Sequence, residues 1–374
     1  MRERIKRERG ASGRPGIGRA AVRLLPRLAV RAGVGVFVVA ALLPFACGDD
    51  EYVGGPVGQP NPNEPYPLWV TSVAYWSKYD RNGNNIFTVE QMPRAVALGI
   101  NPSTGEIWAS AEGLSIYDPD GNLKKKAELS GVRPLEPVIF DTRRGITWVC
   151  YYPEVYDNRL AQFDFDGKHV KDVTLPEQIT RFEDMDVHEA SGTLWFLSKY
   201  KLYKLDEQGE VLFAKTGDDL NYKCDGFCSL EVDQTDGGVW VRGMKGGLTM
   251  PYILKIDKDA KRVREIYGGL IVFYDVNREN GDILVGMNVG DDRGLRLYGK
   301  AGGTLWQSEP TKFIKDATIN DFDGSVWFAH YQRPPVYELC RIMRNGEYAV
   351  RDVTTIRERN SEFRLRVKRD PYPY

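Results

Sequence analysis

Hydrophobic and polar residues alternate with a period of two along most of the chain after residue 67. The segment "GEIWASAEGLSIYDPDGNL", residues 105–123, is typical: short alternating runs are broken at Gly and Asp. Such alternation is the pattern of half-buried β-strands, and Gly and Asp favour the tight turns of hairpins. The pattern therefore predicts an all-β chain of short antiparallel strands.

The strand pattern recurs seven times along the chain. Each copy has a large apolar residue at the matching point of one strand, namely Trp69, Trp108, Trp148, Trp195, Trp240, Leu284 and Trp327. The spacings are 39, 40, 47, 45, 44 and 43 residues, which is the length of a four-stranded β-propeller blade. We therefore expect a seven-bladed β-propeller, in which the Trp packs between neighbouring blades.

The two ends of the repeat region complement each other. The first copy has no strand before Trp69, whereas the chain continues past the last copy with "SEFRLRVKRD", residues 361–370. We expect this C-terminal segment to supply the missing inner strand of the first blade, because closure of the ring removes two exposed sheet edges. The propeller domain would then span residues 67–370. The alternative is six complete blades with the Trp69 copy as an irregular cap.

The phrases "G-x-[IVL]-W" and "[IVL]-x-x-D-x-x-G" recur across residues 67–368, as in "GEIW" and "IYDPDG". In these phrases the chain resembles the NHL-type and streptogramin-lyase-like propellers of bacteria. The resemblance implies the propeller fold. It does not choose a function, because lyases, lactonase-like metalloenzymes, sensor domains and interaction scaffolds all occur among such proteins.

The first 66 residues have a different composition. Residues 1–46 combine ten Lys and Arg residues with a short apolar run and are interpreted as a signal peptide. The ending "LLPFAC" resembles the lipobox of bacterial lipoproteins, which implies lipidation of Cys47; the alternative is an ordinary signal peptide cut near Ala46. Residues 47–66 are rich in Pro and Gly and predict a flexible tether. We expect a periplasmic or cell-surface protein, anchored to the outer membrane.

Charge excludes one class of partner. Residues 1–46 hold ten basic and two acidic residues of the 51 and 52 in the chain, so removing them leaves 41 and 50, a net charge of about −9. A nucleic-acid-binding protein would carry a basic footprint, which this chain lacks. We expect a monomer whose partners are the membrane and an envelope protein, peptide or glycan.

Polar residues on the predicted inner strands are the candidates for a metal site. Counted six residues back from the turn glycine, the copies carry Gly99, Ile139, Asp186, Glu231, Asp275 and Thr318. The three carboxylates, Asp186, Glu231 and Asp275, come from consecutive blades and could hold Ca²⁺ or Mg²⁺, which prefer oxygen ligands. The alternative is a solvated acidic lining of the channel.

Candidates for catalysis are few. Of the three His residues, His188 alone is expected near the channel, so a divalent-metal lyase or lactonase-like enzyme would use it as a base beside Asp186 and Glu231. No phosphate-binding loop or nucleophile elbow is present. In the loop "KCDGFC" we expect a local disulfide between Cys224 and Cys228, because the expected periplasmic compartment is oxidising, and the alternative is a metal-binding or redox role. Cys150 and Cys340 are expected to be separate buried thiols.

The longer connections after the Trp strand should emerge on one rim of the ring. They bring together Tyr, Arg, Met and Pro, a composition common at protein interfaces. The candidate binding residues are Tyr151, Tyr152, Tyr156, Arg293, Tyr331 and Arg333. The first hypothesis is therefore an envelope-anchored binding platform for protein, peptide or glycan. The metal-dependent enzyme is the second.

Overall fold

The computed structural model describes residues 68–367, apart from short gaps. The gaps are residues 73–74, 81, 91–95, 111–112, 129–132, 155–156, 178–180, 247, 269, 288–292, 310–313, 322, 334–335, 351–354 and 358–362. The chain divides into two units, residues 1–59 and 60–374, and all described residues belong to the second. The signal peptide, the tether and Cys47 lie outside the described residues. Within the described residues, no helix is long and apolar enough to cross a membrane.

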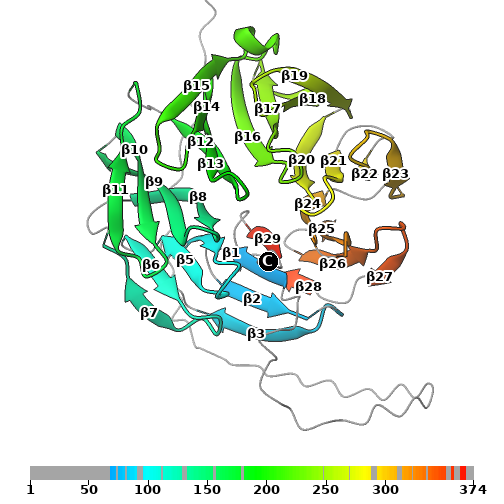
Figure 1. Cartoon of the computed structure of the whole chain (residues 1–374). Helices are drawn as coiled ribbons and strands as arrows, with labels where there is room; N and C mark the ends of the chain where they lie inside the picture. The colour runs from blue at the N-terminus through cyan, green and yellow to red at the C-terminus, as the bar shows by residue number, and fades with distance from the viewer. Residues whose placement is uncertain are drawn as a thin grey trace, which may run out of the picture. The chain divides into compact units, whose positions relative to one another are not determined.

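The strands form seven antiparallel sheets arranged as blades around a ring (Figure 1). Blade 1 consists of β29 (Phe363–Val367), β1 (Leu68–Ser72), β2 (Tyr75–Tyr79) and β3 (Asn85–Glu90). Blade 2 consists of β4 (Val96–Ile100), β5 (Ile107–Ser110), β6 (Leu114–Tyr117) and β7 (Leu123–Lys126). Blade 3 consists of β8 (Arg133–Asp141), β9 (Ile146–Glu154), β10 (Asp157–Asp164) and β11 (His169–Val173).

The remaining four blades follow the same order of strands. Blade 4 consists of β12 (Phe182–His188), β13 (Thr193–Ser198), β14 (Lys201–Leu205) and β15 (Val211–Thr216). Blade 5 consists of β16 (Gly226–Val232), β17 (Val239–Lys245), β18 (Leu248–Ile256) and β19 (Arg262–Tyr267). Blade 6 consists of β20 (Ile271–Val276), β21 (Ile283–Met287), β22 (Gly294–Tyr298) and β23 (Thr304–Gln307). Blade 7 consists of β24 (Ile314–Ile319), β25 (Val326–Arg333), β26 (Val336–Ile342), β27 (Tyr348–Val350) and β28 (Thr355–Arg357).

The C-terminal strand closes the ring. β29 pairs antiparallel with β1, from Leu68 opposite Val367 to Ser72 opposite Phe363, and takes the inner place of blade 1. The predicted closure and the seven-bladed propeller are therefore confirmed, and the six-bladed alternative is wrong. The physical reason is that an uncovered inner edge of β1 would leave backbone groups without partners, which pairing with β29 supplies.

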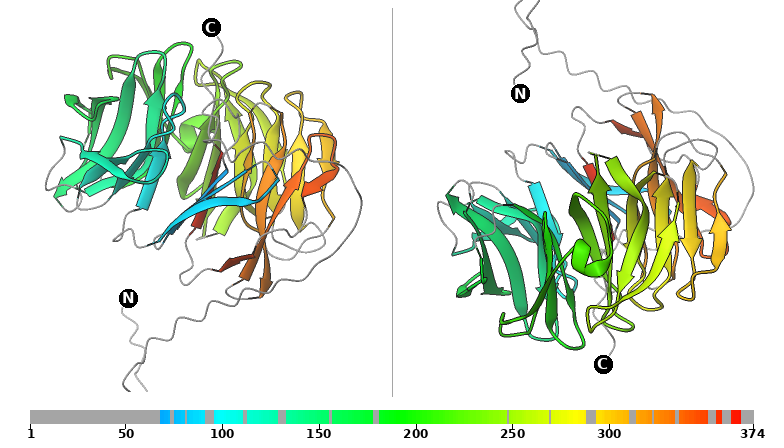
Figure 2. Two further views of the ribbon diagram at one scale, coloured as in Figure 1. Left: turned by 90° about the horizontal axis from the view of Figure 1, so that it is seen from below. Right: turned by 90° about the horizontal axis from the view of Figure 1, so that it is seen from above.

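The blades give the ring two distinct rims (Figure 2). In blades 2 to 7 the turn rim carries the tight turns that follow the inner strand and the third strand, and the loop rim carries the other connections. The turn of blade 2 shows the chemistry: Asp118 accepts hydrogen bonds from the amides of Asp120 and Asn122, and Gly121 has a φ of 82°. The predicted hairpin turns are thus formed by the Asp and Gly residues that mark them in the sequence.

The repeated Trp residues are buried between blades, but several also have a cation over the ring. In blades 1, 4, 5 and 7 the residue opposite the Trp on the next strand is basic, and the pairs are Trp69–Lys78, Trp195–Lys204, Trp240–Lys255 and Trp327–Arg341. The distances from the cation to the ring centroid lie between 5.2 and 5.6 Å. Such contacts add cation–π attraction to the burial of the indole.

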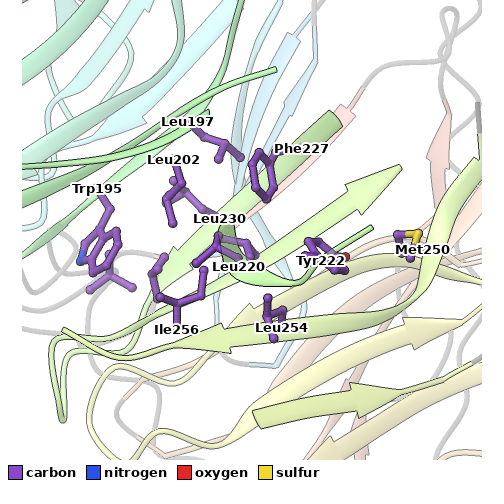
Figure 3. Packing of buried hydrophobic residues seen from close by; sticks show 13 residues of the cluster. Trp195, Leu197, Leu202, Leu220, Tyr222, Phe227, Leu230, Met250, Leu254 and Ile256 are labelled. Atoms are coloured by element: carbon purple, nitrogen blue, oxygen red, sulfur yellow. The ribbon is translucent and has the colours of Figure 1, made fainter. Parts of the chain in front are cut away.

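The core is divided into clusters that join neighbouring blades. In the cluster between blades 4 and 5, Trp195 and Leu197 pack with Leu230 and Leu254, and the connection between the blades adds Tyr222 (Figure 3). The Tyr222 hydroxyl donates to the Tyr252 carbonyl oxygen at 3.1 Å and accepts the Gly243 amide at 2.8 Å. The connection is therefore part of the core, and it holds the two blades in place.

Candidate functional site

A cavity of about 380 Å³ lies among the inner strands of blades 2 to 7. Its lining includes all six residues that stand six positions before a turn glycine, namely Gly99, Ile139, Asp186, Glu231, Asp275 and Thr318. A second set, two residues earlier on each strand, is Pro137, Asp184, Ser229, Phe273 and Asp316. Both sets therefore face one cavity among the inner strands.

The two sides of the cavity differ in chemistry. Blades 2 and 3 contribute Gly99, Ile100, Pro137, Val138 and Ile139, which are apolar. Carboxylates come from blades 4 to 7, and they are Glu183, Asp184, Asp186, Glu189, Glu231, Asp275 and Asp316. Among the residues whose side chains the structure describes, two basic ones, Arg242 and Arg278, line the same cavity. The cavity therefore has an apolar wall and an acidic wall.

The Asp186 carboxylate joins blade 4 to blade 5. One oxygen accepts the Val187 amide at 2.8 Å, and the other accepts the Val232 amide of β16 at 3.0 Å. Asp184 repeats this arrangement two residues earlier, with the Met185 amide at 2.9 Å and the Leu230 amide at 2.9 Å. These carboxylates fasten the two inner strands to each other.

Asp275 joins blades 6 and 7 in the same way. It accepts the amides of Val276 and Ile319, each at 2.9 Å, and the Thr318 hydroxyl at 2.9 Å. The carboxylate gives the backbone amide of the neighbouring blade a hydrogen-bond partner, although the two blades belong to different sheets. The aspartates of the inner strands are therefore bridges between blades.

Arg278 links two blades that are not neighbours in the ring. From the turn after β20 in blade 6, its guanidinium donates to Asp186 at 2.6 Å and to Glu189 at 2.8 Å, both in blade 4. All three side chains are buried. These three charged side chains therefore span the turn-rim end of the cavity. Because they are buried, loss of one of them would leave the charge of its partner uncompensated.

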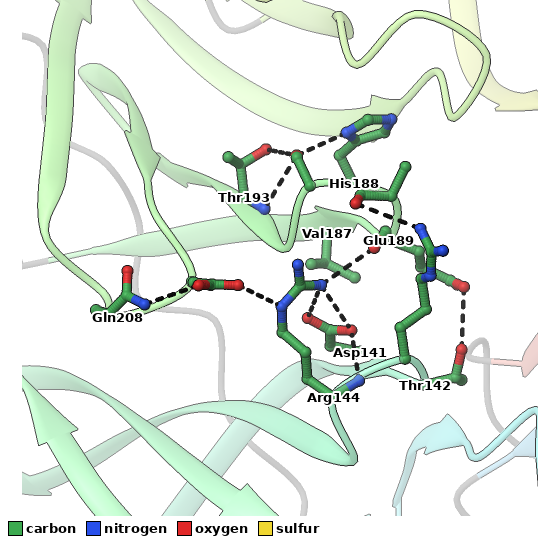
Figure 4. A network of polar contacts seen from close by, with 12 residues as sticks. Asp141, Thr142, Arg144, Val187, His188, Glu189, Thr193 and Gln208 are labelled. Atoms are coloured by element: carbon green, nitrogen blue, oxygen red, sulfur yellow. Dashed lines mark hydrogen bonds and ion pairs between the residues drawn. The ribbon is translucent and has the colours of Figure 1, made fainter.

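The residue three before each turn glycine extends this network along the turn rim. The Thr142 hydroxyl of blade 3 donates to the Glu189 carboxylate at 3.0 Å, and the Glu189 amide donates to Gln234 of blade 5 at 2.9 Å. Arg144 of blade 3 reaches the Glu189 carbonyl oxygen at 3.1 Å (Figure 4). Blades 3, 4 and 5 are thus joined at this rim by polar contacts.

The three predicted metal ligands, Asp186, Glu231 and Asp275, all line the cavity. The bonds described above use both oxygens of Asp186 and of Asp275. Among the described residues, no group of three or more His, Cys, Asp or Glu side chains is arranged to hold a metal ion. The residues present therefore do not fit a Ca²⁺ or Mg²⁺ centre as they stand, and the metal site stays a prediction.

His188 lies away from the lining of the cavity. Its Nδ1 is 2.7 Å from the Ser191 hydroxyl, and its Nε2 is 3.2 Å from the Gln234 carbonyl oxygen of blade 5. Burial lowers the pKa of the imidazole. Both ring nitrogens therefore face groups at the joint of blades 4 and 5, and the arrangement does not bring His188 together with Asp186 and Glu231 as a base for catalysis.

Burial also affects two groups that line the acidic side. It raises the pKa of the Glu183 carboxyl, an effect that Arg181 only partly offsets. It raises the pKa of the Tyr274 phenol too, and the Tyr274 hydroxyl donates to the Trp240 carbonyl oxygen at 2.9 Å. In both cases burial disfavours the charged form of the group.

The four cysteines in the described part of the chain, Cys150, Cys224, Cys228 and Cys340, carry free thiols. Cys150 and Cys340 are buried in separate blades, as predicted. Cys228 lines the cavity, where a bulge between Phe227 and Ser229 interrupts the pairing of β16 with β17. The Cys224–Cys228 disulfide is therefore not formed here, and it stays a prediction for oxidising conditions.

The candidate rim residues have different surroundings. Tyr151 is buried, its hydroxyl donates to Asp172 at 2.7 Å, and burial followed by this carboxylate raises its pKa to about 12. Tyr152 is half-buried and Arg293 is exposed, both on the loop rim. Tyr156 lies outside the described residues. Tyr331 and Arg333 belong to β25, where their backbones pair with Tyr337 and Val336.

Sequence reasoning missed Arg242 and Arg278, two cations that line the cavity. Arg278 stands three residues before a turn glycine, where the other copies carry Pro, Thr, Glu, Gln or Asp. Arg242 stands two residues after Trp240, where the other Trp or Leu strands have uncharged residues. In both cases a basic residue stands at a repeat position where the other copies have none, and this difference could have identified it from the sequence. Arg242 donates to the Val272 carbonyl oxygen of blade 6.

Comparisons with known proteins do not indicate a function for this site. No protein-family model matches this chain, and no curated protein matches it. Among solved structures 894 chains match, as expected of a widespread architecture. One is a protein of unknown function from Bacteroides caccae, which is 12% identical, with a TM-score of 0.46 over 65% of this chain and 93% of that chain. This likeness is too low to transfer any property to the present protein.

Proposed function

We propose that this protein is a binding protein of the bacterial envelope, in which the propeller is a rigid platform for a protein, peptide or glycan. The observation that carries the proposal is that polar side chains of the inner strands are hydrogen-bonded to the neighbouring blade. Asp184, Asp186, Asp275 and His188 are bonded to neighbouring blades, so they strengthen the ring and are poorly placed for chemistry.

The loop rim supports the same proposal. Tyr200, in the hairpin between β13 and β14, is 57% exposed, and Tyr267, at the end of β19, is 63% exposed. The Tyr267 ring packs against Tyr252 with centroids 5.1 Å apart, which holds the exposed ring in place. Exposed and prepositioned tyrosines are common where proteins bind partners, because they bury a large area at little cost in entropy.

Two finer parts belong to the proposal. The anchor would be lipid on Cys47, with residues 47–66 as the tether, and the relationship would be to the NHL-type and streptogramin-lyase-like propellers. Replacement of Cys47 by Ser should release the chain from the membrane fraction. Retention of the Cys47→Ser chain in that fraction would contradict lipid anchoring, and it would leave the platform untouched.

The platform itself is tested with a photo-crosslinking amino acid placed in the full chain in its native envelope. One variant carries p-benzoylphenylalanine at Arg293, which is exposed on the loop rim, and the matched variant carries it at Asp259, which is exposed on the turn rim. We expect a discrete crosslinked partner from position 293 and not from position 259. Equal products from both positions, or none from either, would count against a loop-rim platform.

A further inference from the structure

The loop-rim end of blade 5 carries a row of three tyrosine rings in contact. Tyr222, in the connection from blade 4, packs against Tyr252 of β18 with ring centroids 5.2 Å apart, and Tyr252 packs against Tyr267 of β19 at 5.1 Å. Exposure rises along the row, because Tyr222 is buried, Tyr252 is half-buried and Tyr267 is exposed. The row therefore leads from the core between blades 4 and 5 to the surface.

A row of polar contacts joins the same two ends. The Tyr267 hydroxyl donates to the Glu265 carboxylate at 2.5 Å, and Glu265 forms an ion pair with Arg262. The Arg262 guanidinium in turn donates at 2.7 Å to the carbonyl oxygen of Asn221, the residue before Tyr222. The exposed ring of Tyr267 is thus held by its face contact with Tyr252 and by its hydroxyl.

This double support prepares Tyr267 for binding. An exposed side chain that becomes ordered only in a complex loses rotamer entropy at that moment. The Tyr267 side chain has its ring and hydroxyl contacts within blade 5 already, so a ligand stacked on it would avoid most of this cost. The chemistry of the surroundings indicates which kind of ligand fits.

The size of the aromatic surface favours a small ring over a protein. Tyr252 and Tyr267 together offer at most roughly 500 Å², whereas a stable protein interface takes about 800 Å² from each partner. The connection beside them does not extend the apolar area, because its exposed residues are polar: Asp218, Asp219, Asn221 and Lys223. A ligand ring that covers one tyrosine ring matches the surface available.

Charge favours a neutral ligand of this size. Arg262 and Glu265 neutralise each other, so the pair does not select a phosphate or an ammonium group. A pyranose with equatorial substituents presents C–H groups to each face, and these are attracted to the negative face of an aromatic ring. Its hydroxyls lie at the edge of the ring, where amide, guanidinium and carboxylate groups can bond them.

We propose that Tyr267, supported by Tyr252, is a stacking site for a neutral β-1,4-linked pyranose of an envelope glycan, with the sugar hydroxyls toward Asn221, Arg262 and Glu265. In such a glycan the ring substituents are equatorial, so either face of the sugar can stack. The proposal rests on the binding function proposed above and names its ligand class.

The test is isothermal titration calorimetry on the purified full chain, in micelles of a detergent without a sugar headgroup. The probes are chitohexaose and cellohexaose, two neutral β-1,4-linked hexasaccharides that differ in the N-acetyl group. We expect saturable binding of at least one of them at submillimolar concentration. Binding of neither hexasaccharide would overturn the proposal.

Variants locate the binding on the tyrosine. We expect Tyr267→Ala to weaken the hexasaccharide about ten-fold or more, and Tyr267→Phe to retain most of the affinity because it keeps the ring. The matched control is Tyr200→Ala, which removes another exposed tyrosine, in the hairpin between β13 and β14. Tyr267→Gln is the second variant should Tyr267→Ala fail to fold. Wild-type affinity in a folded variant without the ring would overturn the proposal.

Crosslinking from position 293 in the Tyr267→Ala chain separates this site from the platform as a whole. A retained crosslink together with lost sugar binding supports a glycan site distinct from the protein contact. A lost crosslink, in a protein whose wild type binds neither hexasaccharide, would assign the tyrosines to a protein interface; it would overturn the glycan site and leave the platform standing. Absence of both crosslink and sugar binding in the wild type would reject both proposals.

Discussion

The joint between blades 2 and 3 and the joint between blades 4 and 5 use the same strand position in opposite ways. In blade 2 this position is Gly99, where a Cβ would lie 2.4 Å from the Val138 carbonyl oxygen of blade 3. In blade 4 it is Asp186, whose carboxylate reaches the Val232 amide of blade 5. One joint closes because a side chain is missing, and the other because a charged side chain fills it.

The difference explains the two walls of the cavity. Where the backbones of blades 2 and 3 approach closely, apolar side chains such as Ile100 and Ile139 line the cavity. Behind them the ring of Trp108 packs edge-on against that of Phe140, with ring centroids 5.6 Å apart. Where carboxylates make the bridge, the lining becomes acidic. The residue at this one strand position thus determines both how two neighbouring blades pack and whether the cavity surface between them is apolar or acidic.

Removal of the Asp186 carboxylate should have the largest effect on this comparison. Asp186→Ala leaves the buried Arg278 with one partner fewer and frees two amides, so we expect a loss of about 3–5 kcal/mol in the free energy of unfolding. Urea denaturation followed by circular dichroism measures it. The matched variant Glu210→Ala, at an exposed site, should show no such loss.

A second variant separates the ion pair from the bridge to blade 5. The double variant Asp186→Ala with Arg278→Met removes the unpaired cation, and it should therefore recover part of the stability lost in Asp186→Ala. A double variant as unstable as the sum of the two single variants would mean that Arg278 does not depend on Asp186.

A methyl group at Gly99 tests the close joint. Because its Cβ would meet the backbone of blade 3, Gly99→Ala should cost about 1–3 kcal/mol through overpacking. The control is Gly303→Ala, since a Cβ there would meet nothing within 4 Å. Thermal unfolding of both variants gives the comparison, and a Gly99→Ala protein as stable as Gly303→Ala would show that blades 2 and 3 are not in tight contact.

The smallest effect concerns His188, which stands at the joint of blades 4 and 5 where blade 2 has Asn101. Because its pKa is lowered on folding, the unfolded chain binds the proton more readily. The stability advantage of the neutral ring is complete above the unfolded pKa of about 6.5. It is lost as the pH falls through the lowered folded pKa.

The variant His188→Asn removes this titration and keeps a residue that other blades use at the position. The stability difference between wild type and His188→Asn should therefore shift in favour of the variant between pH 7.5 and pH 5. Urea denaturation at both pH values measures the shift. A difference that does not change with pH would mean that His188 carries the same charge in the folded and unfolded chain.

Much of the fold could be read from local residues. The turn phrases around Asp118 and Gly121 predict hairpins because each turn is completed within a few residues. The alternation of Phe363, Leu365 and Val367 predicted the closing strand, since blade 1 otherwise lacks an inner strand. Counting from the turn glycines also placed Asp186, Glu231 and Asp275 on the lining of the cavity.

The partners of those side chains could not be read in the same way. Asp186 bonds to an amide 46 residues away and to a guanidinium 92 residues away. Neither distance in sequence corresponds to a motif, because both contacts depend on how three blades pack. The interpretation of this column as metal ligands followed from residue type alone, and residue type does not distinguish a carboxylate that binds an ion from one that accepts amides.

By itself the sequence determined the strands, the turns, the seven repeats and the closing strand, because these follow from hydrophobic alternation and from turn residues that act on their near neighbours. The tertiary structure decided which polar side chains form hydrogen bonds between blades and which face the cavity. Gly99 and Asp186 occupy the same position in the repeat. Only the approach of the neighbouring blade makes one a close contact and the other a bridge, and that approach is set by the packing of the whole ring.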